Sequence, residues 1–202
     1  MNLTNNTFMI KGDVENIDNT PLELPFSIIR MSASVIKDMR EIPALWELDL
    51  DGLSGIRLGT LRFNAIRLHA VCRYKKGVKK TDDISPSDVR CIDIHPRALT
   101  LRWAIYARFL LFHEFLHALG FSNHGKEFKR LESMWPDSRA RHLGQAFGLH
   151  LRDMNTRWLW VCPSCDMKHV RYKRSNGRYR CRECMVPLMD IEVNNSTAIK
   201  NG

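Results

Sequence analysis

The segment LRWAIYARFLLFHEFLHALG, residues 101–120, decides the fold that we predict for this chain. Its spacing predicts a helix over residues 101–119, and apolar side chains occur on nearly every face of that helix. A helix that is apolar all round is buried, so we expect it at the centre of a domain. Thr100 is the expected N-cap, and Gly120 is expected to end the helix in a left-handed conformation.

Within this helix the run His113-Glu114-Phe115-Leu116-His117 is an HExxH pattern. Two imidazoles four residues apart lie one turn apart on the same face, so both can bind one zinc ion. Glu114, beside the first histidine, can then take a proton from the water that zinc polarises. The alternative is a pair of core histidines bonded to backbone carbonyls. Because polar groups in so apolar a helix are costly to bury, we favour the metal site.

Such a site needs a third protein ligand, and we predict His124. Gly120 lets the chain turn back, and His124 stands just before a helix expected over residues 126–135. Glu127 is the other candidate, because zinc sites with two histidines and a glutamate exist. Its neighbour Phe128 is expected to face the core, which would leave Glu127 on the solvent side.

Four cysteines form a second pattern, C-x2-C-x15-C-x2-C, with the spacing of a zinc ribbon. Four thiolates leave no open coordination position, so this zinc is expected to be structural and to supply most of the segment's folding energy. The chain is therefore predicted to bind two Zn²⁺ ions, one catalytic and one structural. The four predicted ligands of the structural ion are Cys162, Cys165, Cys181 and Cys184.

Positive charge is concentrated in the same segment. The chain has a net charge of +9, and residues 157–184 contain eight Lys and Arg against two acidic residues. Cations that neutralise phosphates, interleaved with aromatic rings that stack on bases, suit single-stranded nucleic acid. The alternative is a solvated hairpin whose aromatic side chains only cover the zinc site. The residues predicted to bind nucleic acid are Lys168, Arg171, Tyr172, Lys173, Arg174, Arg178, Tyr179 and Arg180.

The rest of the chain predicts an α+β domain. Residues 27–39 have apolar side chains at helical spacing, and residues 138–154 predict a further helix. Alternating patterns predict strands over residues 63–74 and 89–94, in a short antiparallel sheet. Glycine and aspartate over residues 49–59 indicate turns.

An abrupt change of composition after Trp158 predicts a domain boundary. The absence of a long apolar run and of a secretory signal, together with paired CxxC motifs, predicts a cytoplasmic protein, nucleoid-associated or nuclear, without membrane association. We expect a monomer. The predicted parts are a flexible N-terminal arm (1–24), a zinc hydrolase domain (25–156), a zinc ribbon (157–190) and a flexible tail (191–202).

Together the motifs resemble the SprT-like (Spartan-type) zinc metalloprotease family. The resemblance runs from about residue 63 to residue 188, and its matching runs are LFHEFLHA (111–118), HGKEF (124–128) and the cysteine ribbon. The spacer between the last two histidines is shorter than in several members of the family. It is also similar to that of metzincins, but three residues rather than two separate the glycine from the final histidine here.

The resemblance implies a small zincin fold of the minigluzincin kind, followed by a ribbon. It implies zinc bound by His113, His117 and His124, with Glu114 as the catalytic acid and base. The implied activity is proteolysis of proteins bound or crosslinked to DNA, with the ribbon binding the DNA. Two other functions stay open: a nucleic-acid-binding or regulatory protein with a non-catalytic HExxH site, and a metal-dependent hydrolase acting on nucleic acid.

Overall fold

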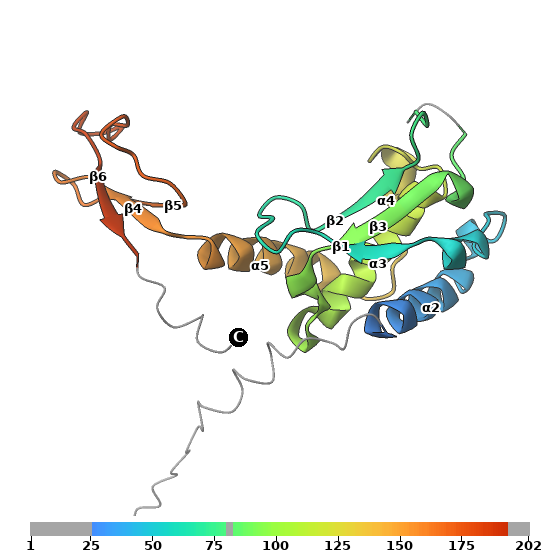
Figure 1. The fold of residues 1–202 in the computed structure, drawn as a ribbon. Helices are drawn as coiled ribbons and strands as arrows, with labels where there is room; N and C mark the ends of the chain where they lie inside the picture. Colours follow the sequence, from blue (N-terminus) through green and yellow to red (C-terminus); the bar gives the residue numbers. More distant parts are fainter. Residues whose placement is uncertain (1–25, 80–82, 194–202) are drawn as a thin grey trace, which may run out of the picture. The chain divides into compact units, whose positions relative to one another are not determined.

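The structure, a computed structural model, describes residues 26–79 and 83–193 and shows a mixed α+β chain (Figure 1). The chain divides into two compact units between Phe147 and Gly148. This division lies inside a helix, earlier than the composition change that predicted a boundary. The predicted arm (1–24), and residues 194–202 of the predicted tail, lie outside the described residues.

The first unit contains a three-stranded sheet of mixed direction. Its strands are β1 (Leu58–Thr60), β2 (Ala70–Tyr74) and β3 (Val89–Ile94), in the order β1-β3-β2 (Figure 1). The bounds of β3 confirm the strand predicted over residues 89–94. β2 is antiparallel to β3, as expected, but β1 is parallel to it, so the prediction of an antiparallel sheet was wrong in part.

Two predictions about this sheet need correction. The strand predicted over residues 63–74 begins only at Ala70, because the preceding residues turn and the Ala65 carbonyl accepts a hydrogen bond from the His95 ring instead of a strand neighbour. Leu58 and Gly59, at the end of the segment predicted as turns (residues 49–59), belong to β1. There Gly59 lies opposite Asp93, and a Cβ on Gly59 would stand 2.5 Å from the Asp93 carboxylate. The glycine that suggested a turn thus lies in a close contact between two strands.

Helix α3 (Ala104–Ala118) is the buried centre of the first unit, as predicted. It packs against β2, β3 and helix α2 (Phe26–Arg40), and many of its side chains are buried. Its start differs from the prediction, because residues 101–103 form a turn of 3₁₀ helix. Thr100 does not cap the helix, since its hydroxyl donates to the Arg97 carbonyl at 3.2 Å.

The end of α3 confirms the role predicted for Gly120, whose φ is +102°. The Gly120 N–H donates to the His117 carbonyl, and the Phe121 N–H donates to the Leu116 carbonyl. This pair of bonds is a Schellman motif, which satisfies the last carbonyls of a helix and reverses the chain. The reversal carries the next residues back along the helix toward the HExxH histidines.

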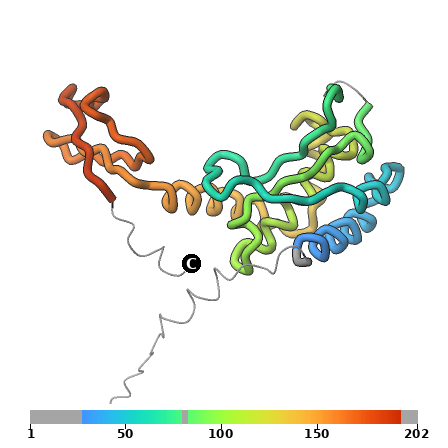
Figure 2. The backbone as a smooth tube through the Cα atoms, viewed as in Figure 1, coloured from blue at the N-terminus to red at the C-terminus, as the bar shows by residue number. Residues whose placement is uncertain are grey.

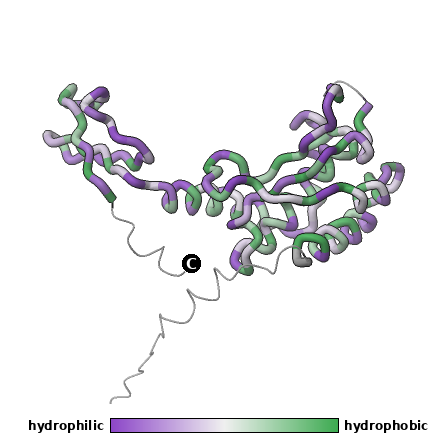
Figure 3. Tube along the Cα trace, viewed as in Figure 1, coloured by the Kyte–Doolittle hydropathy of each residue, from purple (hydrophilic) through white to green (hydrophobic). Residues whose placement is uncertain are grey.

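The other helices of the described chain are α4 (Lys126–Glu132) and α5 (Arg139–Met154). α2 and α5 agree closely with their predictions, and the hydropathy colours alternate along α2 (Figure 3). α4 ends three residues before the predicted limit, and a turn follows it before Pro136. Proline disfavours the helical conformation of the residue before it. No helix in the described part of the chain is long and apolar enough to cross a membrane.

The second unit includes a three-stranded antiparallel sheet with the order β5-β4-β6. Its strands are β4 (Trp158–Val161), β5 (Lys168–Arg171) and β6 (Met189–Glu192), and the backbone trace shows the long connection between β5 and β6 (Figure 2). β6 runs past residue 190, the predicted end of the ribbon. A small hydrophobic cluster lies in this unit, and its buried members are Trp160, Cys162, Cys181 and Leu188.

Candidate metal centres

The structure brings together the three histidines that the sequence singled out. The donor nitrogens of His113, His117 and His124 all lie within 4.8 Å of one another, and the three pairs of ring centroids are each 5.0 Å apart. The Nε2 atoms of His113 and His124 are 3.1 Å apart. Zn–N bonds of about 2.0–2.1 Å at tetrahedral angles require a nitrogen–nitrogen distance of about 3.3 Å. The geometry of this pair therefore suits one small tetrahedral cation.

The alternative ligand, Glu127, does not join this group. Its side chain is 65% exposed and pairs with Arg130 on the same helix at 3.2 Å. The neighbouring Phe128 is 1% exposed, and its ring centroid lies 4.7–4.9 Å from all three imidazoles. One buried ring thus packs against all three histidines, as expected of the residue that holds this segment against the core.

The Nδ1 atoms of two histidines have partners that sequence reasoning missed. Nδ1 of His113 lies 2.6 Å from a carboxylate oxygen of Glu132, and the His117 Nδ1–H donates to the Phe121 carbonyl at 2.7 Å. The hydrogen bond from His113 lowers the pKa of Glu132. One signal was present in the sequence: Glu132 follows Phe128 by four residues, which puts both on the same face of α4.

The side chain of Glu114, a residue of α3, lies against the edge of the sheet at β2. It is 5% exposed, and the backbone N–H of Cys72 in β2 donates to its carboxylate. Burial raises the pKa of Glu114 to about 7, although His113 and the Cys72 N–H both act to lower it. A dication bound by the adjacent histidines would lower this pKa further. Burial, which raises the pKa of this carboxyl, and a cation bound nearby, which would lower it, thus act in opposite directions.

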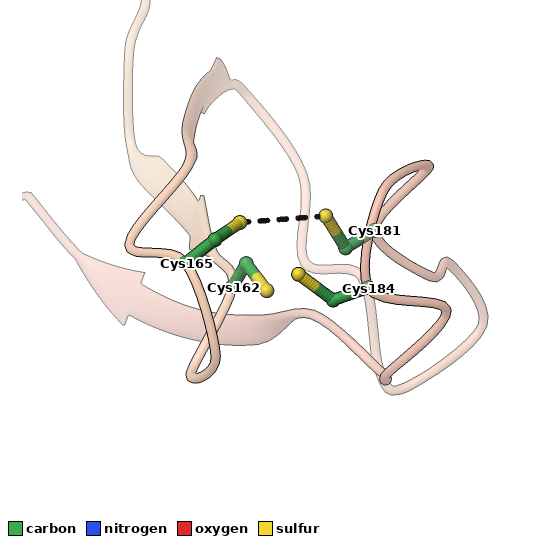
Figure 4. Close-up of side chains that lie close together, drawn as sticks. All are labelled: Cys162, Cys165, Cys181 and Cys184. Carbon is green, nitrogen blue, oxygen red and sulfur yellow. Dashed lines mark hydrogen bonds between the residues drawn. The ribbon is translucent and has the colours of Figure 1, made fainter.

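The four predicted cysteine ligands also converge, as the close-up shows (Figure 4). Their sulfur atoms all lie within 4.8 Å of one another, and the four cysteines are free thiols rather than disulfides. The sulfurs of Cys165 and Cys181 are 3.7 Å apart. Zn–S bonds of about 2.3 Å at tetrahedral angles give a sulfur–sulfur distance of about 3.8 Å. This cluster could bind a metal ion, and its dimensions are compatible with zinc.

The two CxxC turns have the same backbone hydrogen bonds. In each, the fourth residue after the first cysteine donates its N–H to that cysteine's carbonyl, at 3.0 Å in both turns. These residues, Asp166 and Met185, have φ values of 55° and 57°. In the first turn, burial acts to raise the pKa of the Cys162 thiol, but N–H donors from Cys165 and Ser164, together with the neighbouring thiols of Cys165 and Cys181, outweigh it and lower the pKa to about 7. Such N–H donors favour the thiolate, the form that binds metal.

The residues predicted to bind nucleic acid lie on the second unit, and all eight are exposed. Several cations rest on aromatic rings: Arg171 lies 4.9 Å from the Trp160 ring centroid, and Arg174 lies 4.2 Å from that of Trp158. Tyr179, 52% exposed, stacks on Trp160 with centroids 4.5 Å apart. The ribbon therefore presents cations and open aromatic faces together.

Comparisons with protein-family models, with curated proteins and with solved structures give no significant match for this chain. Its function is therefore inferred from the two candidate metal centres and their surroundings.

Proposed function

We propose that this chain is a zinc-dependent metallopeptidase of the SprT-like kind, acting on proteins bound or crosslinked to DNA. The observation that carries the proposal is the convergence of His113, His117 and His124, with two Nε2 atoms 3.1 Å apart. Three protein ligands leave a tetrahedral cation one open position, which is the arrangement of catalytic rather than structural zinc.

The roles of the side chains follow from this arrangement. Zinc bound there would polarise a carbonyl and lower the pKa of water to about 7. Glu114, next to His113 in the HExxH pattern, takes the proton that the water loses and passes it to the departing amine. Its hydrogen bond from the Cys72 N–H holds the carboxylate at the edge of β2.

A peptide substrate is favoured by the strand beside Glu114. In the order β1-β3-β2, β2 has no strand partner on its outer side within the described residues. The Cys72 N–H that reaches Glu114 belongs to this outer edge, because Cys72 lies between residues whose backbone groups pair with β3. An extended peptide can add to such an edge through main-chain hydrogen bonds. Its peptide bonds would then pass beside the carboxylate.

The charge and the aromatic side chains of the ribbon favour a substrate that is associated with nucleic acid. Its eight Lys and Arg between residues 157 and 184 oppose two acidic residues, and its half-exposed tyrosines provide stacking faces. Phosphate neutralisation and base stacking together favour single-stranded DNA over an acidic protein. We therefore propose the ribbon as a DNA-binding accessory of the peptidase, with a structural zinc.

The test is to incubate the zinc-loaded full chain with a basic DNA-binding protein, with and without single-stranded DNA. We expect fragments of the protein that depend on DNA, and none from the Glu114→Gln variant. Intact protein in every reaction, with both metal sites filled, would contradict a peptidase and favour the alternative of a nucleic-acid-binding protein. Nicked DNA would instead favour a hydrolase acting on nucleic acid.

A further inference from the structure

Glu132, the last residue of α4, contacts the three-histidine group from a different element than any of the ligands. One of its carboxylate oxygens lies 2.6 Å from Nδ1 of His113, which belongs to α3. The two side chains are 21% and 22% exposed, so the contact is shielded from much of the solvent. A short hydrogen bond between partly buried groups on two packed helices fixes the position of both side chains.

This contact determines which nitrogen of His113 can bind a metal. A carboxylate oxygen only accepts, so Nδ1 of His113 must carry the proton. In a neutral imidazole the other nitrogen, Nε2, then has its lone pair available. Nε2 of His113 is the atom that lies 3.1 Å from Nε2 of His124. The proton is therefore held on the side away from the cluster, and the lone pair is directed into it.

His117 offers a comparison within the same site. Its Nδ1–H donates to a backbone carbonyl, that of Phe121, at 2.7 Å. That acceptor is neutral and is placed by the Schellman turn. His113 instead has an acidic side chain as its acceptor, which stabilises a proton on Nδ1 more strongly and makes the imidazole a better electron donor. The Nδ1 atoms of the two histidines of the HExxH pattern thus have different partners, a carboxylate for His113 and a backbone carbonyl for His117.

We propose that Glu132 is a positioning residue of this site: it accepts the Nδ1 proton of His113 and so fixes the tautomer and ring orientation that leave Nε2 free for the metal. The inference rests on the metal site of the proposed function. It does not depend on the reaction or on the substrate. Because outer hydrogen-bond partners of ligating histidines typically contribute tenfold to a hundredfold in metal affinity, its loss should be measurable.

The experiment measures Zn²⁺ affinity of the full chain by competition with a chelator, for the native protein and for Glu132→Ala, Glu132→Gln and Glu127→Gln. Glu127 is the matched control, since it lies on the same helix but is exposed and outside the histidine group. We expect Glu132→Ala to weaken the histidine site about 10–100-fold. Glu132→Gln should weaken it less, since its amide oxygen still accepts the Nδ1 proton. The control should match the native protein, and the four-cysteine site, measured in the same titration, should not change.

Equal affinity of the histidine site in Glu132→Ala and in the native protein would overturn the inference. An equal loss of Zn²⁺ affinity in Glu127→Gln and in Glu132→Ala would also overturn it. Peptide cleavage at saturating Zn²⁺ gives a second measurement, in which a positioning role predicts that kcat of Glu132→Gln returns close to the native value. A native protein that binds zinc tightly at the histidines but cleaves no peptide would contradict the proposed function while leaving this inference intact.

Discussion

The two candidate metal centres differ in what holds their side chains in place. The three histidines lie on a buried helix and on the turn that follows it, and the buried ring of Phe128 packs against all of them. The four cysteines lie on two short turns beside a small core, whose buried members include two of the cysteines themselves. The first site thus lies against the core of its unit through Phe128, whereas the ligands of the second are themselves part of a small hydrophobic cluster.

This difference indicates different uses of a metal. An ion bound at a site that is held by apolar packing would not be needed for folding, and three protein ligands would leave one of its positions open. A site whose ligands are its core depends on metal for its folding energy, and four thiolates close the coordination shell. The comparison predicts separable responses of the two units to metal removal and to substitution.

Loss of the ribbon metal should have the largest effect. Apparent binding energies of structural zinc are about 10–16 kcal/mol, more than so small a core can replace. We expect Cys181→Ala to unfold β4, β5 and β6 while α3 keeps its protection, measured by amide hydrogen exchange on the full chain. His124→Ala is the control, and both units should stay protected in it. Slow amide exchange in the ribbon of Cys181→Ala would contradict the claim that the ribbon depends on its metal to fold.

Replacing Glu114 by glutamine tests the three-histidine site. The Cys72 N–H can still donate to the amide oxygen, and a neutral group suits this buried position, so the fold and both metals should be retained. Loss of the proton acceptor should reduce peptide cleavage by roughly 10²–10⁴-fold. Turnover is measured together with zinc content. Unchanged turnover in a variant with both ions bound would exclude Glu114 as the proton carrier.

Replacing Tyr179 tests the surface of the ribbon that carries the four cysteines. Its ring stacks on Trp160 and is half exposed, so it offers one face to a base. Tyr179→Ala should weaken single-stranded DNA binding by about 1–3 kcal/mol, measured by fluorescence anisotropy at fixed salt. Ile191→Ala is the control, because Ile191 is opposite Leu159 and so lies on the other face of the sheet from Trp160. Equal effects of the two substitutions, with zinc retained, would contradict a stacking role.

The smallest effect is expected at the turn that closes the histidine site. Gly120 has a φ of +102°, and an added Cβ would lie 3.0 Å from the Ile84 carbonyl. A side chain in this conformation costs about 1–2 kcal/mol, so Gly120→Ala should lower the melting temperature of the first unit. It should also weaken zinc binding, because the turn places the Phe121 carbonyl against His117. Gly55→Ala is the control, since an added Cβ there meets nothing within 4 Å. A similar melting temperature for both variants would contradict the role of this turn.

The sequence predicts best what local chemistry determines. The position of the central helix and its glycine end follow from residues within about one helix and one turn, and the structure agrees with both, although the helix starts later than predicted. The preference for His124 over Glu127 is also local, and the structure brings His124, not Glu127, to the HExxH histidines. The CxxC turns are equally local, because each presents two thiolates from four residues. Helix and strand patterns of this kind depend on neighbours in sequence rather than on the rest of the fold.

Features that depend on distant residues were missed. β1 is three residues long, contains a glycine and is recognisable only by its pairing with β3. The first part of the strand predicted over residues 63–74 forms turns and bends, and the strand itself begins at Ala70. In the sequence, Glu132 is an ordinary charged residue near the end of a predicted helix. The packing of α4 on α3 brings its carboxylate to His113. Pairing and packing over long separations are not encoded in a local pattern.

The central claim is that His113, His117 and His124 hold one metal ion in addition to the ion of the four cysteines. The most direct test is the number of zinc ions per chain in the zinc-loaded full protein, measured by elemental mass spectrometry after removal of free metal. We predict two ions in the native protein and in Glu127→Ala, and one in His124→Ala with its helices intact by circular dichroism. One ion per native chain, or two in His124→Ala, would contradict the claim.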